Sequence, residues 1–500
     1  MDFPWPLLVA SITILVLSLK LFTNKFSIKK NVKLPPSPPR LPIIGNLHQL
    51  GKMPHLSLHT LSKKLGPVFH LQLGEIPTVV ISSAKMAKEA MKTNDIAISS
   101  RPHIFAAKYL FYNCTNVVFS PYGDYWRYVR KISILELLST KRVQSYAFVR
   151  EEEAARLVRR IEESSYPETV NLTKMLALYA NDVLCRVVFG RDFSGGGEYD
   201  RHGFQKMLEE YQELLGGFSV GEFFPSMEFL HILNGTKSRL VHTFRRFDKF
   251  FDDVIEEHRN SDTGRDHKDF VDVLLEVQQN KDAEIPLTMD NVKAILLDMF
   301  AAGTDTTFIT LDWGMTELML NPRVLKIAQA EVRAVVGERK IVAETDLPHL
   351  HYLKAVIKEV FRLHPPAPVL VPRESIQDIS LGGYTIPKQS RIFINAWAIG
   401  RDPESWTNPD VFEPERFMNN DIDFRGQDFE LIPFGAGRRS CPAIAFGSAT
   451  VELAFAQLLY SFEWELPPGI QPKDLDMTEV FGITMHRVCP MVVVAKPYIF

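Results

Sequence analysis

Cysteine is scarce in this sequence, and charge of one sign does not dominate it. The four cysteines among 500 residues lie far apart and form no Cys-x-x-Cys pair: Cys114, Cys185, Cys441 and Cys489. This spacing argues against a disulfide framework and for a reducing compartment. The formal net charge of −3 gives no overall basic footprint, which argues against a nucleic-acid partner.

The sequence also lacks the usual signs of domain separation. No Gly/Ser-rich linker, low-complexity tract or fixed-period repeat divides it, although its length alone suggests about two to four domains. A hydrophobic content of 46% is ample for a large core. We therefore predict one large, mainly helical domain with smaller β-sheets (α+β) over residues 43–500.

The longest apolar run lies at the N-terminus, from Phe3 to Leu19, and continues to Phe22. Its length is close to the roughly 20 residues that cross a bilayer. The alternative is a cleaved signal peptide, but no basic region leads the run and no small-residue cleavage site precedes Lys25. We predict a membrane anchor over residues 1–23.

A basic and proline-rich segment over residues 24–42 follows the anchor. Closely spaced prolines cannot form a helix and make a semi-rigid spacer, so this segment is predicted to be a hinge. Lysines lie at or after the apolar run, while Asp2 precedes it. By the positive-inside rule the main domain faces the cytosol.

The stretch from Pro433 to Ala443 reads Pro-Phe-Gly-Ala-Gly-Arg-Arg-Ser-Cys-Pro-Ala, directly before an apolar helical pattern. It sets Cys441 at the end of a glycine-rich loop beside two arginines. Positive charge and the N–H groups of a helix N-terminus keep a thiolate ionised. Taken alone, a lone cysteine is more often a small buried hydrophobe, and Gly-x-Gly is often a turn.

The full spacing resembles the haem-binding loop of the cytochrome P450 superfamily, at Phe434, Gly437, Arg439 and Cys441. The resemblance implies that Cys441 binds the iron of haem b as a thiolate and that Arg439 contacts a propionate. The last glycine of the family's motif is replaced here by Ala443. If that position requires a positive φ, alanine costs on the order of 1 kcal/mol; if it requires only closeness, one methyl group is tolerable.

A second motif interrupts a long apolar helix predicted from Thr288 to Leu320. Ala302-Gly303-Thr304-Asp305-Thr306-Thr307 places a glycine and four polar residues in a core helix, where hydroxyls commonly bond back to a carbonyl and bend the helix. Glycine beside a hydroxyl also opens space for small ligands. The motif resembles the family's oxygen-activating segment, which implies that Thr306 hydrogen-bonds the activated oxygen and Asp305 delivers protons.

Other motifs of the family follow in the expected order. Trp126 and Arg130, four residues apart on a helix, resemble a pair that bonds a haem propionate, and Arg373 resembles another propionate contact. The remaining motif resembles a structural triad, not a catalytic one: Glu359, Arg362 and Arg416.

The pocket and its entrance are also assigned by resemblance. Residues 101–120 are predicted to form a loop that roofs the pocket, and the apolar segment from Phe223 to Leu233 either dips into the bilayer or belongs to the core. The candidate pocket residues are all apolar: Ala107, Leu110, Phe111, Val117, Phe218, Ala302, Val369 and Phe481.

The resemblance covers nearly the whole chain and is closest to plant microsomal members of the A-type, or 71 clan. It implies a fold with haem between the long central helix and the cysteine loop. It further implies oxygen insertion from O2 into a lipophilic specialised metabolite such as a terpenoid, alkaloid or phenolic. Electrons would come from NADPH through a reductase, at the endoplasmic reticulum membrane. A basic patch for that partner is expected at Arg127, Arg130, Lys131 and Arg438.

Two other functions remain as alternatives. Family members that rearrange a peroxide need no reductase, but they tend to lack the acid–threonine pair. A non-catalytic membrane haem carrier leaves Asp305 and Thr306 unexplained.

Overall fold

The computed structural model describes residues 33–164, 168–193, 201–217, 219–260, 267–339 and 341–499, with the backbone alone described for 201–205. The predicted anchor, the first part of the hinge and Phe218 lie outside the described residues.

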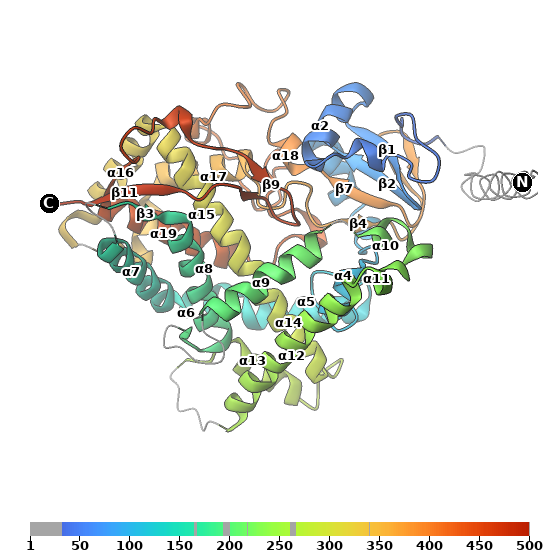
Figure 1. Ribbon diagram of the computed structural model, residues 1–500, viewed down its shortest axis with the longest axis horizontal. Coiled ribbons are helices and arrows are strands. Elements are labelled where there is room, and N and C mark those ends of the chain that lie inside the picture. The colour runs from blue at the N-terminus through green and yellow to red at the C-terminus, as the bar shows by residue number, and fades with distance from the viewer. Residues whose placement is uncertain are drawn as a thin grey trace, which may run out of the picture.

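The helices of the described residues occupy most of the chain (Figure 1). They are α2 (Pro54–Leu65), α3 (Ala84–Lys88), α4 (Phe105–Leu110), α5 (Asp124–Ile132), α6 (Thr140–Ser145), α7 (Ala147–Ser164), α8 (Leu172–Phe189), α9 (Arg201–Gly216), α10 (Val220–Phe223), α11 (Leu230–Leu233), α12 (Thr236–Asn260), α13 (Phe270–Gln279), α14 (Met289–Leu297), α15 (Gly303–Leu320), α16 (Pro322–Val336), α17 (His351–Leu363), α18 (Ala396–Ile399) and α19 (Ile444–Ser461).

The strands form four small sheets among the described residues. They are β1 (Val68–Leu73), β2 (Ile76–Ile81), β3 (Val170–Asn171), β4 (Arg373–Glu374), β5 (Ile379–Leu381), β6 (Tyr384–Ile386), β7 (Arg391–Ile394), β8 (Phe462–Glu465), β9 (Glu479–Val480), β10 (His486–Arg487) and β11 (Val492–Pro497). The orders are β1-β2-β7-β4, β3-β11-β8, β5-β6 and β9-β10. The sheets are antiparallel except for the parallel pair β2–β7. The α+β class is confirmed.

The predicted long helix exists from Met289 to Leu320, but it is not uniform. Thr288 caps its start, and its hydroxyl accepts the N–H of Asn291 in a capping box. A π-helical turn, Asp298–Ala302, joins α14 to α15. Such turns are rare and occur often at functional sites, and nothing in the apolar periodicity predicted this one.

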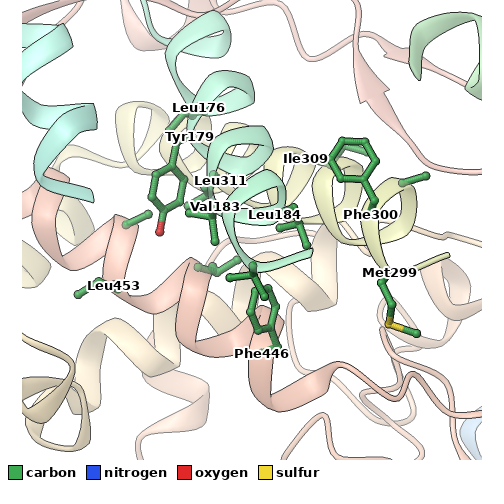
Figure 2. Packing of buried hydrophobic residues seen from close by; sticks show 14 of the residues in the cluster. Leu176, Tyr179, Val183, Leu184, Met299, Phe300, Ile309, Leu311, Phe446 and Leu453 are labelled. Atoms are coloured by element: carbon green, nitrogen blue, oxygen red, sulfur yellow. The ribbon is translucent and has the colours of Figure 1, made fainter. Parts of the chain in front are cut away.

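The core surrounds α15, which packs against α8, α17 and α19 (Figure 2). Leu184, Phe300 and Phe446 belong to this core and come from three different helical segments. A Cβ at Gly303 would lie 2.9 Å from Leu184 Cδ1, so this glycine lets α8 approach α15 closely. Among the described residues, two helical stretches are long and apolar enough to span a membrane, Met289–Leu320 and Ile444–Ser461. Both are mostly buried in this core.

One local prediction is wrong. Residues 101–120 are not loop throughout, because α4 (Phe105–Leu110) lies within them and packs on α12. The apolar residues of this segment follow no clear helical period, but burial of Phe105, Ala107 and Leu110 stabilises the helix. The helix ends where Tyr112, with φ 48°, begins a turn of left-handed residues.

Candidate active site

The cysteine loop is shaped by two glycines in the left-handed region, Gly435 and Gly437, each with φ +67°. The turn brings the Cys441 N–H to the carbonyl of Phe434 at 2.8 Å. A Cβ on Gly437 would lie 2.4 Å from an Asp95 carboxylate oxygen, so both the φ angle and the available space require glycine here.

Ala443 is not strained in its place in the motif. Its φ is −100°, so the penalty expected for a left-handed alanine does not arise. Its N–H donates to the Cys441 sulfur at 3.4 Å. Burial raises the pKa of the Cys441 thiol, while the Ala443 N–H and the positive charge of Arg130 lower it. The effect of burial on this pKa is larger than the opposing effect of the two groups. The sulfur therefore needs a bound metal cation in order to be ionised.

Four arginines from separate segments lie around the same space, namely Arg101, Arg130, Arg373 and Arg439. Each donates to backbone carbonyls: Arg101 to Val118, Val371 and Pro372, Arg130 to Ser440, Arg373 to Ala436, and Arg439 to Ser99, Val117 and Ser120. Arg101, Arg373 and Arg439 are buried. Arg101 was missed from the sequence, because one arginine before a proline carries no motif by itself.

These buried cations lack sufficient negative charge among the described residues. Burial lowers the pKa of Arg373 to about 10, and burial with the neighbouring arginines lowers the pKa of Arg439 to about 9. The Arg373 Nη1 atom has no hydrogen-bond partner there, and Asp95 lies 3.6 Å from it. Carboxylates that enter this space would satisfy the cluster.

Trp126 supports the cluster from α5. Its indole N–H donates to the Val117 carbonyl at 3.0 Å, and the Arg439 guanidinium lies 3.9 Å from its ring centroid. This contact is a cation–π interaction that fixes the arginine over the indole. In the described contacts, Trp126 therefore positions Arg439 and the segment at Val117.

An internal cavity of about 290 Å³ lies between the cysteine loop and α15. Its lining brings together these predicted residues: Phe111, Val117, Arg130, Ala302, Asp305, Thr306, Arg373, Phe434, Arg439 and Cys441. Four predicted pocket residues are absent from it: Ala107, Leu110, Val369 and Phe481. The first two are buried in α4, Val369 packs on the β1–β2 core, and Phe481 stacks on His55. Ile483 and Thr484 reach the cavity from the segment that follows Phe481.

Asp305 and Thr306 of α15 have different hydrogen-bond partners. The Thr306 hydroxyl donates to the Ala302 carbonyl at 2.8 Å. Asp305 is buried and accepts a hydrogen bond from the Thr484 hydroxyl, and His486 Nε2 lies 3.2 Å from its other oxygen. Both residues line the cavity. Of the two, only Asp305 contacts the C-terminal hairpin, which is formed by β9 and β10.

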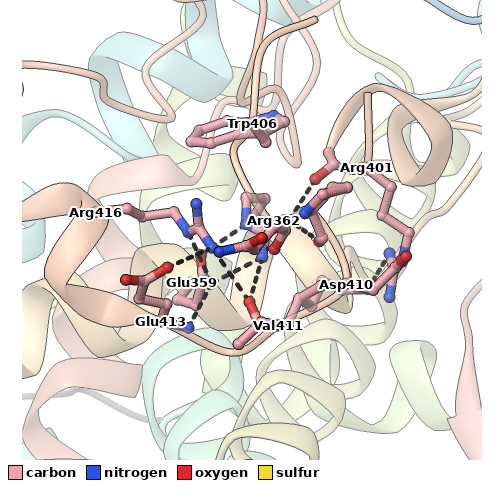
Figure 3. Close-up of polar contacts among 12 residues, drawn as sticks. Glu359, Arg362, Arg401, Trp406, Asp410, Val411, Glu413 and Arg416 are labelled. Carbon is pink, nitrogen blue, oxygen red and sulfur yellow. Dashed lines mark hydrogen bonds and ion pairs between the residues drawn. The ribbon is translucent and has the colours of Figure 1, made fainter. Parts of the chain in front are cut away.

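Glu359 and Arg362 of α17 contact Arg416, the third residue of the predicted triad (Figure 3). Arg362 donates twice to Glu359, both at 2.7 Å, and Arg416 donates to the same carboxylate at 3.0 Å. Arg362 also donates to the carbonyls of Gly400 and Val411. Since Glu359 and Arg362 are fully buried, this network ties α17 to the coil that leads toward the cysteine loop.

The donor set fits one kind of prosthetic group. A cysteine sulfur needs a metal cation, and buried arginines nearby need carboxylates. The cavity beside Phe434 and the N-terminal part of α15 lies between them. An iron porphyrin with two propionates meets all of these demands, so the fold and site define a haem-thiolate protein.

Comparison with known proteins supports the assignment to the haem-thiolate class. The family model described as Cytochrome P450 matches residues 35–493, and the chain belongs to this family. It is 70% identical to Cytochrome P450 71AP13 of Prunus mume over 486 residues, which cover 97% of this chain and 94% of that protein. It is 47% identical to phenylacetaldehyde oxime monooxygenase CYP71AN24 of Prunus mume, over 99% of this chain and 94% of that one.

A solved zebra fish cytochrome P450, in a structure with abiraterone, has the same fold. Its TM-score is 0.77 at 25% identity, and the match covers 90% of this chain and all of that one. The predictions of a cytochrome P450 fold, a plant 71-type member and a monooxygenase are therefore confirmed.

Proposed function

We propose that this monooxygenase acts on a neutral, lipophilic specialised metabolite that enters the cavity beside Thr306. One observation carries the proposal: the walls near α15 are largely apolar, with Phe111, Val117 and Met299 among them, while the arginines occupy the rim beside the cysteine loop. Those cations face the place that the propionates need, and the described walls near α15 carry no further cationic side chain for an anionic substrate. The relative that acts on phenylacetaldehyde oxime supports a small organic substrate.

Each residue of the site has its own role in the proposed reaction. When bound, haem supplies the activation of O2 and the cleavage of its O–O bond. Cys441 would hold the iron, and Arg130, Arg373 and Arg439 would hold the propionates. Thr306 would hold a proton at its hydroxyl for transfer into the cavity, which requires the hydroxyl to leave the Ala302 carbonyl. Asp305 would pass protons toward Thr306.

NADPH–cytochrome P450 reductase is the proposed electron donor. Arg127, Lys131 and Arg438 are exposed and lie on α5 and on the cysteine loop. Arg130 of the expected patch instead lines the cavity and donates to the Ser440 carbonyl, which joins α5 to that loop. Arg438 also has an ion pair with Asp95 at 3.3 Å, which holds it on this face. These cations form a surface close to Cys441 that suits an acidic flavoprotein partner.

The proposed site of action is the endoplasmic reticulum membrane, with residues 1–23 as a single-pass anchor. Two exposed apolar segments support this proposal. One includes Ile43, directly after the hinge, and the other includes Phe229, Ile232 and Leu233 around α11. The β1–β2 turn joins them, because the Gly74 N–H donates to the Ile44 carbonyl and the Glu75 N–H to the Phe223 carbonyl. The two segments thus form one face suited to the bilayer surface.

The test is reconstitution of the full-length protein with reductase, NADPH and a panel of neutral plant terpenoids, alkaloids and phenolics, each paired with a carboxylate analogue. We expect substrate-induced shifts of the haem spectrum from neutral members only. Products of those members should carry oxygen from labelled O2. Efficient turnover of a carboxylate analogue would overturn the proposed substrate class, and product formation without reductase would overturn the proposed electron route.

A further inference from the structure

The C-terminal hairpin is fastened to α15 by two pairs of groups with opposite charge. His486 Nε2 lies 3.2 Å from an Asp305 carboxylate oxygen, and Arg487 Nη1 lies 3.6 Å from Asp312. Asp305 and Asp312 are seven residues apart, so they share one face of the helix. The Thr484 hydroxyl binds the second oxygen of Asp305, so both oxygens have partners from the hairpin segment.

The two pairs differ in ways that matter for chemistry. The side chains of Arg487 and Asp312 are 2% and 4% exposed, and an arginine does not release its proton in proteins. The His486 side chain is 29% exposed, whereas Asp305 is 8% exposed and lines the cavity. His486 is therefore a titratable group that touches solvent on one side and the cavity's acid on the other.

The charges around His486 favour its protonated form. The groups that face it from α15 are Asp305, Asp312 and the ring of Phe308, and Arg487 follows it in β10. Burial lowers the pKa of His486, but the hydrogen bond to Asp305 and the charges of Asp305 and Asp312 outweigh that effect and raise it.

We propose that His486 is the residue that supplies protons from solvent to Asp305. In each transfer the His486 Nε2–H bond breaks and an O–H bond forms on Asp305, which leaves a neutral imidazole and a carboxylic acid. The neutral imidazole keeps its Nδ1 proton, so the ring must turn its vacant Nε2 toward the exposed side, where a proton from solvent restores the imidazolium. This inference rests on the proposed role of Asp305 as the acid that serves Thr306.

The first test measures protonation and not turnover. Holoenzyme is labelled with ¹³C-histidine, and the pKa of His486 is read by NMR in the diamagnetic ferrous carbon monoxide complex, with His486→Gln to assign the signal. We expect a pKa above the ordinary histidine value that falls toward it in Asp305→Asn. A His486 pKa that Asp305→Asn leaves unchanged would overturn the proposal.

The second test separates a relay from a structural contact. His486→Arg keeps a positive charge beside Asp305 but cannot cycle a proton, whereas His486→Gln removes both. We expect both variants to divert NADPH electrons to hydrogen peroxide, with product formation reduced on the order of tenfold or more and an increased solvent isotope effect. Normal coupling in His486→Arg would show a merely structural role and overturn the relay.

A matched control is available in α12. The buried His258 contacts Asp269 at 2.8 Å, which is another histidine–aspartate pair, but neither residue lines the cavity. His258→Gln should leave the coupling of the enzyme unchanged. If Asp305→Asn itself couples normally, the proposed function of Asp305 fails. If Asp305→Asn uncouples while His486→Gln does not, only the relay fails.

Discussion

Gly437 shows how one residue sets the position of the haem ligand. Its φ of +67° lies in the left-handed region, and the side chain of Asp95 and the backbone of Met91 fill the space where a Cβ would go. Asp95 also accepts the Arg438 N–H and pairs with Arg373. A displaced Asp95 would therefore disturb both the loop and an arginine proposed to hold a propionate.

We predict that Gly437→Ala abolishes or strongly reduces haem incorporation. The matched control is Gly469→Ala, because Gly469 has φ +86° but no atom within 4 Å of its would-be Cβ. That control should cost only about 1 kcal/mol of stability from the left-handed conformation. Haem content measured by absorbance on purified protein checks both variants. Equal haem loss in the two would show that conformation, and not the contact with Asp95, decides the effect.

At the scale of elements, the network around Glu359 holds α17 against the chain before the cysteine loop. A carboxylate without exposure lies between two guanidinium groups, and its removal takes away the carboxylate partner of the buried Arg362, while Arg416 keeps Glu413. We predict that Glu359→Gln lowers the free energy of unfolding by about 3–5 kcal/mol and weakens haem retention.

The control for that variant is Glu276→Gln, which breaks an ion pair with Lys268 whose side chains are 58% and 53% exposed. An exposed pair is worth about 0–1 kcal/mol. Denaturant unfolding followed by the haem absorbance gives both values. Similar losses in the two variants would contradict the assignment of the network as the structural lock of α17.

The π-helical turn also connects two elements. The Asp298 carboxylate accepts hydrogen bonds from Asn116 Nδ2 at 2.7 Å and from the N–H groups of Val117 and Val118 at 2.6 and 3.1 Å. It therefore fastens the segment that supplies Val117 to the cavity. Burial raises the pKa of Asp298 to about 7, although these three donors lower it.

We predict that Asp298→Asn costs about 1–3 kcal/mol, because the amide cannot accept all three donors. The raised pKa means that the folded protein binds this proton more tightly than the unfolded chain. Stability from this group is thus fully present below the unfolded pKa, near 4, and is lost as the pH rises through about 7. Melting temperatures of the holoenzyme between pH 5 and pH 8 should fall less steeply in Asp298→Asn. An unchanged slope would contradict a titrating Asp298.

An element could be predicted from the sequence where its own residue pattern determines its structure. The α+β class and the long apolar helix from Thr288 to Leu320 follow from composition and periodicity. The π-turn and α4 do not, because both depend on packing from distant segments. The same limit explains Arg101, and it explains why Phe481 lies against His55 while Ile483 and Thr484 reach the cavity. A shift of two or three residues along a loop is invisible in spacing alone.

At the scale of the whole molecule, the apolar face around Ile43 and Phe229 sets how the domain would lie on a membrane. Phe229 is 57% exposed, and Ile341, at 56%, offers a matched control that lies outside the two segments of this face. We predict that an environment-sensitive fluorophore on Phe229→Cys is quenched by spin-labelled lipid in vesicles, while the same probe on Ile341→Cys is not, after subtraction of labelled wild type. Equal quenching at both positions would contradict this orientation.

The central claim is that Cys441 binds haem iron as a thiolate, and all other roles depend on it. The most direct measurement is the difference spectrum of the reduced, carbon monoxide-bound full-length protein, beside Cys441→Ala. Thiolate ligation by Cys441 predicts a Soret band characteristic of thiolate-ligated haem in the wild type and its absence in the variant. A band characteristic of a neutral ligand in the wild type, or the thiolate band in Cys441→Ala, would contradict it.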